Sequence, residues 1–152
     1  MKKLYSLFVM SLPVLLTAQI SEIDINPAGD SSPNTFVDFA GQLVFVASDG
    51  TTGVEPWISD GTTLGTTILK DINTGSTAAG NSNPDWFTVL NGEVYFRAGN
   101  GTDLNGAELW KSDGTEVGTI QIEDIQVGTG SSNPQHFFVF NNLLYFQAND
   151  VS

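Results

Sequence analysis

Hydrophobic and polar residues alternate along several short stretches of the chain, a pattern typical of strands that bury one face. Residues 86–90, WFTVL, and residues 93–98, EVYFRA, are two such stretches, joined by Asn91 and Gly92. Asn-Gly favours a two-residue type I′ turn, because both central residues of that turn need a positive φ. We therefore predict an antiparallel hairpin over these residues.

The same pattern recurs about every 50 residues. ELWKSDGTEVGT at residues 108–119 nearly repeats EPWISDGTTLGT at residues 55–66, and each copy predicts a second hairpin. The repeat units cover about 24–69, 71–122 and 124–152. Four antiparallel strands in roughly 50 residues are the pattern of a β-propeller blade. We expect an all-β, propeller-like chain of about two and a half four-stranded blades, a fragment of a larger ring.

Comparison of the units predicts which face of each second strand is buried. One alternating set of positions stays apolar in every unit, whereas the residues between them become polar along the chain. This set, expected to pack between blades, comprises Leu43, Phe45 and Ala47, then Val94, Phe96 and Ala98, then Leu144, Phe146 and Ala148. Trp57 and Trp110, at the start of the third strands, should pack with it.

The repeated Ser-Asp-Gly-Thr loops have a structural explanation. Asp60 and Asp113 can accept hydrogen bonds from backbone N–H groups of their own turns. Gly61 and Gly114 allow a left-handed backbone. We predict that these four residues are structural; the alternative is that the acidic side chains bind a cation or another ligand.

At these loops the chain resembles the ELWxxDGT repeat family of secreted bacterial proteins, of the Bacteroidetes type. Residues 108–110 and 113–115 match that motif in full, and residues 55–62 match it except for Pro56 in place of leucine. The resemblance implies an exported, repeat-built, β-propeller-like protein. It implies no particular activity.

The first 18 residues have the pattern of a secretory signal peptide. Lys2 and Lys3 precede an apolar stretch that Pro13 interrupts and that ends in Ala18, the predicted cleavage position. An uncleaved membrane anchor is the alternative, although the stretch is short for a span. If the signal peptide is cleaved after Ala18, residues 19–152 are the secreted or cell-surface protein, with no transmembrane span.

The acidic balance of the chain limits its expected partners. Without residues 1–18 it has three basic residues against 17 acidic ones, hence a formal charge of −14. Nucleic acid is not an expected partner, because phosphate contacts need a basic patch. A protein or a glycan is the expected ligand, and the open strand edges of an incomplete ring favour self-association.

Loops that differ in length between the units are the expected place for a binding site. The densest polar loop of this kind, GNGTDLNGAE, begins at residue 99. Its candidate binding residues are Asn100, Asp103, Asn105 and Glu108. Their oxygen atoms could bind Ca²⁺, although the spacing does not match an EF-hand. A solvated loop without a ligand is the alternative.

Catalytic residues are not predicted. His136 is the single histidine, and Trp86 and Thr35 occupy its position in the other units. No nucleophile is paired with a base in the sequence pattern. The chain is therefore interpreted as a non-catalytic binding or adhesion module. The alternatives are a carbohydrate-active enzyme with a pair of carboxylates and a calcium-stabilised structural module.

Overall fold

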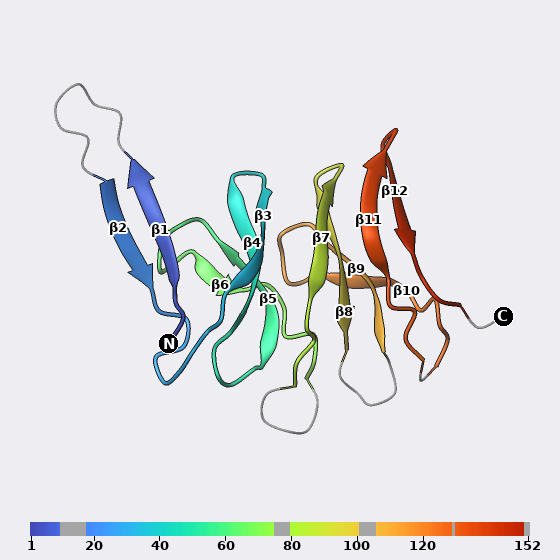
Figure 1. Cartoon of the computed structure of the whole chain (residues 1–152), viewed down its shortest axis with the longest axis horizontal. Helices are drawn as coiled ribbons and strands as arrows, with labels where there is room; N and C mark the ends of the chain where they lie inside the picture. Colours follow the sequence, from blue (N-terminus) through green and yellow to red (C-terminus); the bar gives the residue numbers. More distant parts are fainter. Residues whose placement is uncertain (10–17, 75–79, 101–105, 129, 151–152) are drawn as a thin grey trace.

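The computed structural model describes residues 1–9, 18–74, 80–100, 106–128 and 130–150. Over these residues the chain is all β, and its sheets stand side by side in a row (Figure 1). The strands are β1 (Leu4–Val9), β2 (Ala18–Ile23), β3 (Asn34–Phe39), β4 (Gln42–Ser48), β5 (Val54–Ser59), β6 (Thr66–Ile68), β7 (Asp85–Leu90), β8 (Glu93–Gly99), β9 (Ala107–Ser112), β10 (Ile120–Glu123), β11 (Gln135–Phe140) and β12 (Leu143–Gln147).

Two of the sheets are complete four-stranded blades. In the first blade β3, β4, β5 and β6 pair in sequence order, and in the second blade β7, β8, β9 and β10 do the same. All of these pairings are antiparallel. β11 and β12 form a half blade that matches the first two strands of the others. The structure thus confirms the predicted propeller-like architecture of four-stranded antiparallel blades.

Short turns join the first and second strands of each blade. Between β7 and β8, Asn91 and Gly92 have φ values of 53° and 78°. Positive φ at both central residues is the geometry that a type I′ turn requires. The turns Ala40-Gly41 and Asn141-Asn142 also have positive φ at both residues.

The core of the second blade follows the predicted alternation. Val94, Phe96 and Ala98 of β8 have exposed fractions of 0%, whereas Tyr95 and Arg97 between them are half-buried. Trp110 of β9 pairs directly with Phe96 and is also buried. The predicted core positions are therefore confirmed in this blade.

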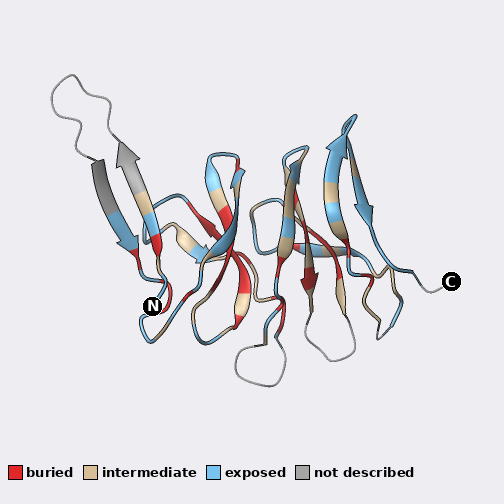
Figure 2. Ribbon diagram, in the orientation of Figure 1, coloured by how far each residue is buried: buried red, intermediate tan, exposed pale blue. Residues whose placement is uncertain are grey.

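β4 of the first blade is buried on both faces, which the sequence comparison did not predict. Val44 lies in a core cluster with Phe96 of the second blade. Phe45, its neighbour in sequence, lies in a second cluster with Leu4 and Ile23 from β1 and β2. The neighbours on both sides cover this blade, so the alternation in burial disappears (Figure 2).

In the half blade the predicted core positions are wrong. Leu144 is half-buried, Phe146 is 36% exposed, and Ala148 is exposed. In the complete blades a tryptophan of the third strand pairs across from the equivalent phenylalanine, as Trp110 does with Phe96. Phe146 packs its ring on Phe137 at 5.6 Å, and no third strand covers it within the described residues.

β1 and β2 form a separate hairpin beside the first blade (Figure 1). Leu4 and Ile23 pack against that blade, and the hydroxyl of Ser31 donates to the Lys2 carbonyl at 2.9 Å. The interpretation of residues 1–18 as a signal peptide stays a prediction.

No helix in the described part of the chain has the length and apolar character needed to cross a membrane.

The two equivalent phenylalanines give a direct test of this core. Phe96→Ala removes a fully buried ring, and we expect it to lower the free energy of unfolding by about 3–5 kcal/mol. Phe146→Ala should cost less than half as much, because its ring is already partly in water. Urea unfolding of both variants measures the difference. Equal losses would mean that another surface, such as a second copy of the chain, covers Phe146.

Candidate functional site

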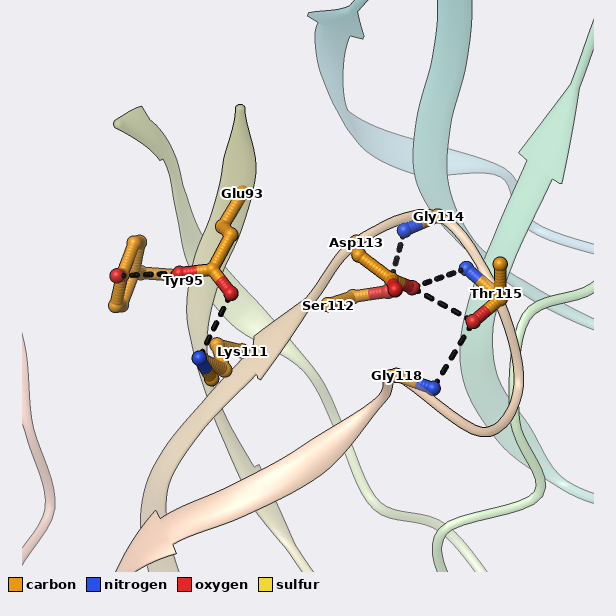
Figure 3. Close-up of polar contacts among 8 residues, drawn as sticks. All are labelled: Glu93, Tyr95, Lys111, Ser112, Asp113, Gly114, Thr115 and Gly118. Carbon is orange, nitrogen blue, oxygen red and sulfur yellow. Dashed lines mark hydrogen bonds and ion pairs between the residues drawn. The ribbon is translucent and has the colours of Figure 1, made fainter. Parts of the chain in front are cut away.

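The Ser-Asp-Gly-Thr loop of the second blade satisfies its own polar groups (Figure 3). The carboxylate of Asp113 accepts hydrogen bonds from the N–H of Thr115 at 2.9 Å and from its hydroxyl at 2.6 Å. Ser112 Oγ accepts from the N–H of Gly114, and Thr115 Oγ1 accepts from the N–H of Gly118. Each repeated residue of the motif therefore has a partner inside the loop.

The loop of the first blade repeats this network. Asp60 accepts from the N–H and hydroxyl of Thr62 at 2.9 and 2.7 Å, and Gly65 donates to Thr62. The Thr62 bonds lower the pKa of the Asp60 carboxyl, as the Thr115 bonds lower the pKa of Asp113. In both carboxylates Oδ1 thus accepts two hydrogen bonds from its own turn.

The loops also contact the preceding unit of the array. A Cβ atom on Gly114 would lie 3.0 Å from the buried ring of Phe39 in the first blade. Lys70 of the first blade donates to the carbonyl of Glu116 at 3.2 Å. In the first blade, the carbonyl of Gly61 accepts a hydrogen bond from Ser6 of β1. The motif therefore serves both turn formation and blade packing.

Glu55 connects the first blade to the second. Its carboxylate is 0% exposed and lies at the start of β5. The N–H groups of Ile72 and Ser82 donate to it at 3.0 and 2.9 Å, and the Ser82 hydroxyl donates a third bond. Both donors lie in the segment that leads from β6 to β7. We call Glu55 and its counterpart Glu108 the inter-blade carboxylates.

Glu108 makes the same contacts one unit later. The N–H groups of Ile125 and Ser132 donate to it at 3.2 and 2.8 Å, and the Ser132 hydroxyl adds a third bond. The side chain is 1% exposed. The structure therefore places this candidate binding residue inside the protein, with its oxygen atoms bonded to the segment that enters β11.

The rest of the candidate polar loop is described only in part. Asn100 is half-buried, directly after β8. Asp103 and Asn105 lie outside the described residues, so their proposed role as cation ligands stays a prediction. Among the described residues, no three His, Asp or Glu side chains group closely enough to hold a metal ion.

The sequence pattern assigns no role to Glu55 and predicts Glu108 to be a binding residue, which its burial and its bonds to Ile125 and Ser132 do not support. The serine partners of the inter-blade carboxylates are 24 and 27 residues away along the chain, beyond any local pattern. A signal was present, since Ser82 and Ser132 both precede an Asn-Pro dipeptide at the same place in their units. Recurrence of that serine together with the glutamate indicates the contact.

A second repeated feature lies at the start of each first strand. Thr35, Trp86 and His136 have φ values of 53°, 58° and 58°, unusual for residues other than glycine. Each sits at a shift in register, where its strand has one extra residue relative to its partner. These three bulge residues are all exposed, although β3, β7 and β11 contact one another in order.

Two of the bulge residues are aromatic and adjacent. The ring centroids of Trp86 and His136 are 5.1 Å apart, and the rings are tilted by 54°. Beside Trp86, Asp85 forms an ion pair with Arg97 of β8. Burial raises the pKa of Asp85, and the charge of Arg97 opposes that rise. The exposed aromatic residue Trp86 thus directly follows Asp85 in the chain, and the Asp85–Arg97 ion pair is half-buried.

Other polar contacts of the second blade are surface interactions. Lys111 of β9 donates to Glu93 of β8 at 2.7 Å, and Tyr95 donates to the same carboxylate at 2.8 Å (Figure 3). The Lys111 bond lowers the pKa of Glu93. A pocket of about 240 Å³ lies at the turn between β3 and β4, lined by Asp38, Gly41, Gln42 and Leu43. Asp38 is the single titratable residue in that lining.

Comparison with known proteins adds no relative. The chain matches no family model, no curated protein and no solved structure.

Substitution of the two loop glycines separates backbone strain from blade packing. Gly61 and Gly114 have φ values of 89° and 90°, but a Cβ atom on Gly61 would meet nothing within 4 Å. We expect Gly61→Ala to cost about 1–2 kcal/mol of stability through strain alone. Gly114→Ala should cost more, because Phe39 must also move. Urea unfolding midpoints check this, and a larger loss for Gly61→Ala would contradict the packing role.

The stability of the chain should depend on the protonation of Glu55. Burial raises the pKa of its carboxyl from 4.5 to about 7, although its three hydrogen bonds oppose the shift. Protonation of Glu55 therefore stabilises the folded chain fully below about pH 4.5, and this stabilisation is lost as the pH rises through about 7. We expect a loss on the order of 2 kcal/mol in unfolding free energy across that window.

Glu55→Gln is the matched variant, since its amide does not titrate. The difference in unfolding free energy between wild type and variant should change across the same pH window. Urea titrations at pH 4.5, 6 and 8 measure it. A difference that stays constant with pH would show that Glu55 titrates alike in the folded and unfolded chain.

Proposed function

We propose that this protein is a non-catalytic, exported binding module that acts at or outside the cell surface. One observation carries the proposal. The repeated acidic residues are bonded within the scaffold, whereas one exposed position per unit combines the same backbone geometry with different side chains, namely Thr35, Trp86 and His136. A constant frame that presents variable side chains is the arrangement of a binding surface.

The proposed export rests on the sequence. The pattern of residues 1–18 and the resemblance to ELWxxDGT repeat proteins both favour a secreted or cell-surface location. The acidic charge of the chain is consistent with solubility outside the cell and disfavours nucleic acid. The exposed Leu143 and Tyr145 of β12, at 58% and 51%, support self-association as a further proposal.

The proposal is tested by separating binding from turnover. The purified chain is incubated with insoluble polysaccharides and with protein-coated beads, and both retention and released products are measured. We expect retention without released sugars. Product release that a carboxylate substitution abolishes would favour the enzyme alternative, and an increase in melting temperature with millimolar Ca²⁺ would favour the calcium-stabilised module.

A further inference from the structure

We propose that Trp86 and His136 form a stacking platform for a neutral saccharide. This inference rests on the proposed binding function and names its ligand class. The two residues come from neighbouring units, yet their rings lie 5.1 Å apart across the boundary between β7 and β11. Because the rings are tilted by 54°, a saccharide stacked on one ring would meet the other at an angle and would contact two blades.

Trp86 differs from the other two tryptophans in its exposure. Trp57 and Trp110 are each 7% exposed in the core, whereas Trp86 is 38% exposed. Its ring therefore has apolar surface in contact with water that a ligand can cover.

The backbone at this position is strained as well. Left-handed φ values at Trp86 and His136 cost about 1–3 kcal/mol each, and such strain persists where the surrounding structure holds it. Ser82 and Ser132, four residues earlier in each case, are fixed by the inter-blade carboxylates. The same backbone conformation occurs with threonine at Thr35 in the first unit, so the bulge does not depend on an aromatic side chain.

The neighbouring groups fit sugar hydroxyls. Asp85 and Arg97 pair across β7 and β8, and Gln135 and Gln147 occupy the same places in β11 and β12. Carboxylate, guanidinium and amide groups are planar and can exchange paired hydrogen bonds with adjacent hydroxyls. Aromatic rings beside such groups suit a ligand that has an apolar C–H face and a polar rim, which a pyranose ring has.

The charge of the molecule favours a neutral saccharide over an anionic one. The whole chain has a formal charge of −12, and Arg97, the cation beside the platform, already pairs with Asp85. A protein ligand is less favoured, because a stable protein interface needs about 1,200 Å² or more of buried surface. Two adjacent aromatic rings offer a smaller contact, of the kind that a saccharide ring needs.

Tryptophan fluorescence provides the test, because Trp86 is the exposed member of the three tryptophans. The full chain is titrated with hexasaccharides of β-1,4-glucose, β-1,4-xylose, β-1,4-mannose and, as the anionic comparison, β-1,4-mannuronate. We expect a neutral hexasaccharide to shift the emission and to protect it from acrylamide quenching. Trp86→Thr, which introduces the side chain of the first unit, should weaken binding by at least about tenfold.

Three controls make the outcome decisive. Leu64→Ser changes a 94% exposed residue of a Ser-Asp-Gly-Thr loop and should leave binding unchanged. His136→Ala, followed by isothermal calorimetry, tests the platform if Trp86→Thr fails to fold. Melting temperatures of all variants exclude a loss of binding through unfolding.

Each result supports or overturns the inference. Equal affinity of wild type and Trp86→Thr for a neutral hexasaccharide would overturn it and leave the proposed binding function intact. Preference for the mannuronate hexasaccharide would overturn the neutral class. Retention on protein-coated beads through Trp86, without saccharide binding, would assign the platform to a protein ligand. If the chain is retained on none of the surfaces and binds none of the saccharides, the proposed function is overturned as well.

Discussion

The contact between each buried glutamate and the next blade is the constraint on which the array depends. Glu55 and Glu108 are 0% and 1% exposed, and a carboxylate so placed is unfavourable unless donors replace its water. All three donors to Glu55 come from the segment that leads into the second blade. The contact therefore fixes the path of the connecting segment that leads to the following strand.

Local features of this fold could be predicted from the sequence, because local chemistry determines them. Asn91-Gly92 indicates its turn, and the alternation along β8 indicates its buried face. Features that depend on neighbouring blades could not be predicted in the same way. The comparison of units placed Phe146 in the core, but burial there requires a tryptophan from a third strand.

The candidate site shows the same division between local and distant causes. A polar loop is visible in the sequence, yet the role of Glu108 depends on Ser132, which lies 24 residues away. The bulge residues occupy one position that varies between the units, but neither tryptophan nor histidine signals a left-handed backbone. The strain at Trp86 comes from the pairing of whole strands, so the aromatic platform became visible in three dimensions alone.

The residues of each inter-blade contact are synthesised in a fixed order. Glu55 is synthesised 27 residues before Ser82, so a chain that emerges amino end first completes β5 before the donors exist. The Glu55 side chain lacks these donors until the following segment is present, and that segment both covers Glu55 and leads into the next blade. A chain that ended between the two residues would leave Glu55 without the two bonds from Ser82.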